Sequence, residues 1–215
     1  AAMSSLVSYA LHDSIATLAM DDGKANVLSP EMLAALNQAL DRAEADAAVV
    51  LLTGRPGVFS GGFDLRVLTA GGQPAVDMLM GGFELAARLL AFPRPVVMAC
   101  TGHAVAMGAF LLLSGDYRVG PLGPYKFVAN EVAIGLTMPW SAVEILRQRL
   151  TPADFNRALL LAEVYSGEDA RRAGFVDVLA EPDEVVDGLL TGWHEPEASH
   201  LRMLAALTGE RFLER

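Results

Sequence analysis

The hydrophobic residues of this chain follow two alternating patterns. Short runs rich in apolar and β-branched residues predict strands at residues 15–20, 49–52, 95–99, 116–119 and 175–178. The segments between some of these runs carry an apolar residue at every third or fourth position, as at Leu33, Leu36 and Leu40, and predict amphipathic helices. A strand that is apolar on both faces, such as 49–52, is typical of a parallel sheet covered by helices, so the alternation predicts an α/β fold.

Polar residues and prolines mark the ends of the predicted helices. Ser29, Pro30 and Glu31 supply an N-cap, a proline at the first helical position and an acid in the first turn. The remaining predictions are helices over 78–90 and 106–113, a glycine-rich loop at 69–74, a mostly helical chain after Pro139, capping boxes at 151–154 and 166–169, and a helix end at Gly174.

Length and composition narrow the class of protein. A chain of 215 residues predicts one core domain, taken as residues 3–190, followed by a short helical segment at 191–215. Of the residues, 53% are hydrophobic and only 20% are charged, so the chain has more apolar surface than one domain of this size usually buries. This surplus of apolar surface predicts a subunit interface. No apolar run reaches the roughly 18 residues of a membrane span.

The charge balance and the single cysteine exclude further classes. A net charge of −10 without any basic run argues against binding to nucleic acid or to anionic membranes, so the expected partner is a small molecule or another copy of the chain. Cys100 has no partner cysteine, which excludes a disulfide framework and favours a reducing cytoplasm. The four histidines lack paired metal-ligand spacing, and no bound metal or separate cofactor is expected.

Common catalytic motifs are missing from the sequence. Ser60 does not lie in the G-x-S-x-G pattern of serine hydrolases. The chain also lacks the G-x-G-x-x-G and Walker patterns, which leaves dinucleotide and nucleoside-triphosphate binding without support.

Two glycine-rich turns carry the strongest chemical signal. Residues 59–65 (FSGGFDL) and 101–110 (TGHAVAMGAF) each follow an apolar strand, and the second opens directly into an apolar helix. Their separation of about forty residues allows one crossover unit of parallel sheet between them. Small residues at the start of a helix leave backbone N–H groups without partners, so the two turns together predict a site that holds an oxyanion.

Glu131 is the acid most suited to catalysis. It lies in the apolar segment 130–140 (NEVAIGLTMPW), where burial is expected to raise its pKa toward neutral pH, as a base that abstracts a proton from carbon requires. The alternative, an ordinary surface cap or ion pair, is the commoner role of a glutamate.

These features, in this order, resemble the enoyl-CoA hydratase/isomerase (crotonase) superfamily over about residues 6–190. The resemblance rests on the two turns, on Asp116-Tyr117-Arg118 and on the Glu131 segment. It implies the crotonase (ClpP-like) α/β fold, a spiral of repeated ββα units with a C-terminal helical region. It also implies that the backbone amides of Phe63 and Met107 hold the thioester oxygen of the substrate.

One departure from the family pattern points to the type of reaction. Hydratases of the family carry a second glutamate at the position of Phe110, and a phenyl ring there cannot orient water. The segment with Glu131, Gly135 and Pro139 is similar to that of Δ3,Δ2-enoyl-CoA isomerases, which work with one glutamate. The expected function is therefore an isomerase that moves a double bond from C3 to C2 of an enoyl-CoA, with an acyl slot lined by Phe110, Ile134, Leu136, Met138 and Trp140.

The resemblance also implies where coenzyme A binds and how the chain assembles. Coenzyme A, carried as part of the substrate, is expected along Lys24, Ala25, Val27, Gly62, Leu65 and Arg66, with Lys24 and Arg66 near the phosphates unless they are ordinary solvated charges. A homotrimer or a dimer of trimers is expected. Two alternatives remain open: a hydratase or acyl-CoA thioester hydrolase, and a non-catalytic acyl-CoA-binding protein.

Overall fold

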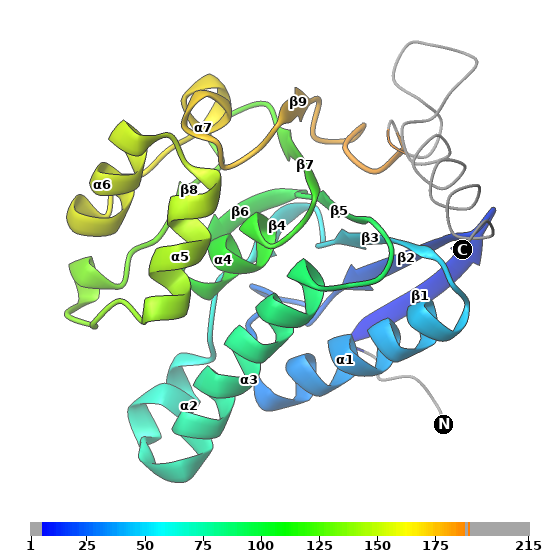
Figure 1. Ribbon diagram of the computed structural model, residues 1–215, viewed down its shortest axis with the longest axis horizontal. Helices are drawn as coiled ribbons and strands as arrows, with labels where there is room; N and C mark the ends of the chain where they lie inside the picture. The colour runs from blue at the N-terminus through cyan, green and yellow to red at the C-terminus, as the bar shows by residue number, and fades with distance from the viewer. Residues whose placement is uncertain (1–5, 188, 190–215) are drawn as a thin grey trace.

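The computed structural model describes residues 6–187 and 189, and in this part of the chain two sheets pack with helices that lie mainly below and to the left of the strands in Figure 1. The larger sheet has the strand order β1 (Val7–His12), β2 (Ile15–Met20), β3 (Val49–Thr53), β5 (Val96–Ala99), β7 (Tyr117–Pro121) and β9 (Val178–Ala180). The hairpin β1–β2 is antiparallel, and the other neighbouring strands are parallel. The smaller sheet joins β4 (Gly57–Ser60), β6 (Gly102–Val105) and β8 (Phe127–Val128), all parallel.

The helices follow the strands in a repeating order. The chain passes from a strand of the larger sheet to a strand of the smaller sheet and then to helix, three times in succession, which confirms the predicted ββα units. The helical elements are α1 (Pro30–Ala45), α2 (Leu65–Ala70), α3 (Gly72–Leu90), α4 (Met107–Leu113), the 3₁₀ turn Val132–Ile134, α5 (Trp140–Arg149), α6 (Pro152–Leu161) and α7 (Gly167–Ala173).

Helix α4 occupies the centre of the core. All seven of its residues are buried, and it packs against α3, α5, β4 and β6. Helix α1 begins as predicted, because the Ser29 side chain accepts a hydrogen bond from the Met32 amide and Pro30 stands at the first helical position. Its predicted apolar stripe is buried against the sheet and α3. This packing supports α4, whose N-terminus is part of the second glycine-rich turn.

An ion pair ties the C-terminal helices to the larger sheet. The Arg118 side chain in β7 is 6% exposed and donates to both carboxylate oxygens of Asp177, one of them at 2.6 Å. Arg118 also donates to the Gly174 carbonyl at the end of α7, where Gly174 adopts the left-handed conformation expected of a helix-ending glycine. The pair therefore fixes where α7 ends and β9 begins.

Two sequence-based element predictions are wrong. The loop predicted at 69–74 is helical on both sides of Gly71, because Asp64 caps α2 through the Arg66 amide and Gly71, at φ 68°, joins α2 directly to α3. The last strand begins at Val178 rather than at Phe175, which is buried in the core. The strands β1, β4, β6 and β8 were missed, and three of these form the smaller sheet.

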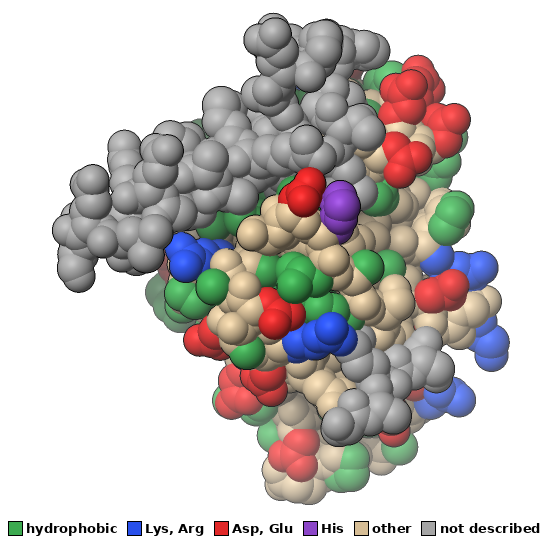
Figure 2. All heavy atoms as spheres, turned by 90° about the vertical axis from the view of Figure 1, so that its right-hand side faces the viewer, with side chains coloured by type: hydrophobic (Ala, Val, Ile, Leu, Met, Phe, Trp, Pro, Cys, Tyr) green, Lys and Arg blue, Asp and Glu red, His purple; other side chains and the backbone are tan. Residues whose placement is uncertain are grey.

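The predicted helical segment at 191–215 lies outside the described residues, so the boundary of the core domain at residue 190 stays a prediction. None of the helices that the structure describes is long and apolar enough to cross a membrane. On the face that Figure 2 presents, acidic and basic side chains are both scattered over the surface.

Candidate active site

The first glycine turn is held in place by a buried serine and a buried asparagine. Ser60 Oγ donates to the Asn26 carbonyl at 2.8 Å and accepts a hydrogen bond from the Gly62 amide at 3.2 Å. Asn26, which sequence reasoning missed, is fully buried and donates to the carbonyl oxygens of Met20 and Phe59. These hydrogen bonds fix the backbone that leads to the Phe63 amide.

The two glycine turns touch each other. Gly62 has φ +90°, and a Cβ atom on it would lie 2.9 Å from Ala106 Cβ and 3.0 Å from the Val105 carbonyl oxygen. Only glycine fits this approach without strain. Gly108 similarly allows α4 to pass close to the Ser60 carbonyl. The contact brings the Met107 nitrogen within 3.3 Å of the position that a Cβ atom on Gly62 would take.

Ala106 makes the sharp corner between β6 and α4. Its φ of 52° and ψ of −127° are unusual for a residue with a side chain, and its amide is held by the Val128 carbonyl at 2.9 Å. Strained backbone of this kind is concentrated at functional sites. The corner lets α4 begin directly after β6, with Met107 as its first residue.

Within residues 6–187, the amides of Phe63 and Met107 donate to no acceptor. Phe63 is half-buried, whereas Met107 is fully buried. Buried amides without partners are rare in native structures, because an unpaired N–H costs free energy. The two amides are therefore suited to bind an oxygen atom supplied by a ligand.

Glu131 lies at the same edge of the smaller sheet as the two amides. The strands β4, β6 and β8 run parallel, and Phe63, Met107 and Glu131 follow their carboxyl ends within two or three residues. The carboxyl ends of parallel strands are where ligands bind in many α/β proteins. The topology thus brings together three residues that are almost seventy positions apart in the sequence.

The environment of Glu131 favours its protonated form. The residue is 8% exposed, and its Oε2 atom has no hydrogen-bond partner among the described residues. Burial raises the pKa of Glu131 from 4.5 to about 7, against a smaller opposing effect of a hydrogen bond from its own amide. No neighbouring carboxylate contributes to the shift. Perturbed carboxyl groups of this type are typical of general acids and bases.

Phe110 forms part of an aromatic wall rather than a polar site. It is 1% exposed, and its ring centroid lies 6.1 Å from that of Phe83. The Phe83 ring in turn lies 6.3 Å from the ring of Phe63 in an edge-to-face arrangement. Three rings from α3, α4 and the first glycine turn therefore exclude water from one side of the core.

The other residues predicted to line the acyl slot lie mostly at the surface. Ile134 is 53% exposed, Leu136 is 47% exposed and Trp140 is 74% exposed, while Met138 packs partly against the core. The described part of the chain does not enclose the three exposed side chains. Their role in binding an acyl group stays a prediction.

The turn predicted to bind coenzyme A lies against the first glycine turn. The Ala25 carbonyl accepts a hydrogen bond from the Gly61 amide at 2.8 Å. The Asp22 carboxylate organises the turn by accepting from the amides of Lys24, Asn26 and Val27. Burial alone would raise the pKa of Asp22, but these hydrogen bonds outweigh it and hold the pKa below its usual value.

The charged and apolar side chains of this region are exposed. Leu65 is 64% exposed, and Lys24 also faces solvent. Arg66 is paired with Asp64 at 2.8 Å, although its own side chain is 90% exposed. The pair holds the guanidinium over the start of α2, where it remains accessible to an anionic ligand.

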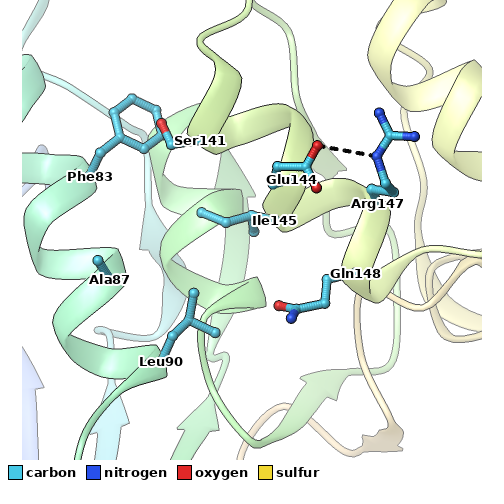
Figure 3. A pocket seen from close by; sticks show the side chains of 8 residues that line it. All are labelled: Phe83, Ala87, Leu90, Ser141, Glu144, Ile145, Arg147 and Gln148. Carbon is cyan, nitrogen blue, oxygen red and sulfur yellow. Dashed lines mark ion pairs between the residues drawn. The ribbon is translucent and has the colours of Figure 1, made fainter.

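A groove that sequence reasoning missed lies between α3 and α5, and it is called the α3–α5 groove below. Its volume is about 360 Å³, and Phe83, Ala87 and Leu90 of α3 face Ile145 of α5 across it (Figure 3). Phe83 also belongs to the aromatic wall. Because the groove is made by two helices distant in sequence, no local pattern predicts it.

Metal ligands are not gathered anywhere in the described part of the chain. No group of three or more His, Cys, Asp or Glu side chains lies close enough to hold an ion there.

The sequence and the fold both have relatives of known class. The profile of the Enoyl-CoA hydratase/isomerase family matches residues 10–208. A putative enoyl-CoA hydratase of Thermus thermophilus is 34% identical over 173 residues, which cover 78% of this chain and 68% of that protein. The matching segments cover between 59% and 68% of the length of such curated relatives, which are longer than this chain.

Two solved structures are similar over almost the whole chain. The apo structure of an enoyl-CoA isomerase from Mycobacterium tuberculosis is 50% identical, with a TM-score of 0.84 and coverage of 97% of this chain and 92% of that one. The enoyl-CoA hydratase EchA3 of Mycobacterium ulcerans is 48% identical, with a TM-score of 0.85 and the same coverage. The two names differ in the reaction, but the fold and the family agree, and the chain belongs to the enoyl-CoA hydratase/isomerase family with the crotonase fold.

Proposed function

We propose that this protein is a Δ3,Δ2-enoyl-CoA isomerase in which Glu131 is the only general base. Glu131 removes a proton from C2 of a 3-enoyl-CoA, and the electron pair moves onto the thioester oxygen to form a dienolate. The amides of Phe63 and Met107 donate hydrogen bonds to that oxygen. Glu131, now protonated, returns the proton to C4, and the double bond ends between C2 and C3.

The observation that carries the proposal is the isolated carboxyl group of Glu131. Its pKa of about 7 is raised by burial, without any contribution from a second carboxylate. A base with a pKa near the working pH is efficient both at taking a proton and at returning it. A hydratase of this family uses two glutamates, and the second position is Phe110, which is 1% exposed within an aromatic wall.

The two amides supply the electrostatic part of the mechanism. They have no other acceptor in the described chain and belong to turns that touch at Gly62 and Ala106. Because these donors are already oriented, little reorganisation is needed when charge develops on the thioester oxygen. Loss of one such donor in other enzymes typically slows the reaction by about 10² to 10³.

The proposal extends to the rest of the substrate and to the assembly. The adenine and pantetheine parts of coenzyme A lie along Ala25, Val27, Gly62 and Leu65, and Lys24 and Arg66 approach the phosphates. The exposed apolar side chains of Leu160, Leu161 and Val164 support a closed homo-oligomer, a trimer or a dimer of trimers. A reducing cytoplasm suits Cys100, whose thiol is buried and whose pKa is raised to about 12 by burial.

The similarity to proteins named enoyl-CoA hydratase favours water addition as the second candidate. The two reactions are separated by incubating the protein with a 3-enoyl-CoA and, separately, with a 2-enoyl-CoA, and following the ultraviolet absorbance of the conjugated thioester. An isomerase raises the absorbance with the first substrate and leaves the second unchanged. Loss of absorbance with the second substrate means that water is added and contradicts the proposal.

Glu131→Gln tests the base directly, because the amide has nearly the same shape as the carboxylate but cannot accept the proton. Its rate is expected to fall at least about a thousandfold. Glu168→Gln, at an exposed position of α7, is the matched control and is expected to keep the wild-type rate. Binding of acyl-CoA without turnover in the wild type favours a non-catalytic binder instead.

A further inference from the structure

The α3–α5 groove is built from two matching helix faces. Phe83, Ala87 and Leu90 follow the i, i+4, i+7 positions of α3, and Ser141, Ile145 and Gln148 follow the same spacing on α5. Seven residues of helix span about 10 Å at 1.5 Å per residue. The groove is therefore an elongated channel rather than a round pocket, and Figure 3 shows Phe83 and Ser141 near one end and Leu90 and Gln148 near the other.

The floor of the groove is apolar and its rim is polar. Ile145 is buried, while Phe83, Ala87 and Leu90 are partly or largely exposed and present only hydrocarbon. Glu144 and Arg147 pair with each other on the rim, with 3.3 Å between Glu144 Oε1 and Arg147 Nε, and both side chains are about half exposed. The charges of Glu144 and Arg147 therefore balance each other on the rim. The apolar floor is suited to an uncharged, flexible hydrocarbon chain.

One end of the groove lies beside the aromatic wall of the candidate active site, because Phe83 belongs to both. A methyl group on Gly82 of α3 would collide with the Phe63 ring and would lie 3.6 Å from Met107 Cγ. The next residue, Phe83, contacts the rings of both Phe63 and Phe110 and also lines the groove. Helix α3 therefore touches both residues whose amides are proposed to bind the thioester oxygen, and its next residue, Phe83, lines the groove.

We propose that the α3–α5 groove binds the distal methylene groups of the acyl chain, so that the preferred substrates are acyl-CoA thioesters of about ten or more carbons. The groove length of about 10 Å corresponds to roughly eight bonds of an extended hydrocarbon chain, because each bond of about 1.5 Å advances the zigzag by only about 1.3 Å. Carbons 1–4 remain at Glu131 and the amides, and the tail passes the aromatic wall at Phe83. This inference rests on the proposed acyl-CoA function and specifies the class of acyl group.

The test uses saturated acyl-CoA thioesters as binding probes and 3-enoyl-CoA thioesters as substrates, each with six and with twelve carbons. Ala87→Trp fills the middle of the groove from an exposed helical position, and Leu90→Glu places a charge at its far end. Ala34→Trp, at an exposed position of α1 outside the groove, is the matched control. Circular dichroism and thermal unfolding establish that each variant is folded.

The wild type is expected to bind dodecanoyl-CoA at least tenfold more tightly than hexanoyl-CoA, because burial of each methylene group strengthens binding. Ala87→Trp and Leu90→Glu are each expected to reduce this ratio at least fivefold, and the ratio of kcat/KM for the twelve- and six-carbon substrates falls with it. Ala34→Trp keeps both ratios within twofold of the wild type.

Any other outcome contradicts either the groove inference or the proposed function. If folded Ala87→Trp and Leu90→Glu keep the wild-type ratios while isomerase activity is present, the groove inference fails and the proposed function stands. If the binding ratio changes as expected but no isomerase activity is found, the groove inference stands and the proposed function fails. A change in sedimentation of Ala87→Trp without a change in chain-length preference assigns the groove to a subunit contact and overturns the inference.

Discussion

Replacement of Glu131 by glutamine is expected to stabilise the folded protein above neutral pH. Glu131 is 8% exposed, its Oε2 atom has no hydrogen-bond partner among the described residues, and burial raises its pKa from 4.5 to about 7. A carboxyl group in this environment resists ionisation in the folded state, whereas in the unfolded chain it ionises freely in water. Glutamine never ionises, so the variant avoids this destabilisation.

The direction and size of the effect follow from the two pKa values. Because the folded pKa lies above the unfolded one, the folded protein keeps a proton between pH 4.5 and about 7 that the unfolded chain has lost. The contribution of Glu131 to stability is therefore fully present below pH 4.5 and is lost as the pH rises through about 7. At about 1.4 kcal/mol per pH unit, the difference is worth about 3 kcal/mol.

Urea unfolding of the wild type and of Glu131→Gln at about pH 4 and about pH 8 measures this difference. The free energy of unfolding of the variant, relative to the wild type, is expected to be about 3 kcal/mol higher at the alkaline pH than at the acidic pH. Glu168→Gln serves again as the exposed control and is expected to show nearly the same relative stability at both values. A relative stability of Glu131→Gln that does not change with pH would refute the assignment of a raised pKa to this buried carboxyl group.

Further predictions concern the base, the turns and the core. The kcat/KM of the wild type is expected to rise with pH through about 7, because only ionised Glu131 accepts a proton, and a flat pH–rate profile would contradict that role. Gly62→Ala is expected to lower kcat about 10²-fold by pushing the two turns apart, whereas Gly23→Ala, also at positive φ but in open space, keeps kcat in the same steady-state assay. Arg118→Ala is expected to lower the free energy of unfolding by about 3 kcal/mol in urea titrations, because it leaves Asp177 without its buried partner, while kcat of the folded fraction stays unchanged. Ser60→Ala is expected to raise the activation free energy calculated from kcat by more than it lowers the free energy of unfolding measured in urea. Equal changes in the two free energies would remove its positioning role.

Much of the larger sheet could be predicted from local pattern. Residues 49–52 are apolar in succession, and β3 is buried on both faces. Ser29 with Pro30 marks the start of α1 within one residue. These signals are local, because strand burial and helix capping depend on neighbouring residues. The smaller sheet was missed because β6 begins at Gly102 and β8 has only two residues, so neither shows a strand pattern.

The local sequence pattern also led to a wrong prediction at the glycines between α2 and α3. Residues 69–74 contain two glycines and a proline, which together predict a loop. In the structure Gly71 is a single hinge residue between α2 and α3, since its φ of 68° both ends one helix and starts the next. The N-cap residue Asp64 determines where α2 begins. In the sequence, this single capping residue is a weaker signal for a helix than the following glycines are for a loop.

The sequence by itself determined the α/β class, the ββα repeat implied by its family resemblance, and the candidacy of Glu131 and the two glycine turns. These depend on residue type and short spacing. Only the tertiary structure decided that the turns touch at Gly62 and Ala106, that Asn26 holds the first turn, and that α3 and α5 form a groove reaching the aromatic wall. Such features arise where strands and helices distant in sequence pack together, because close packing, rather than any local preference, determines which side chains meet.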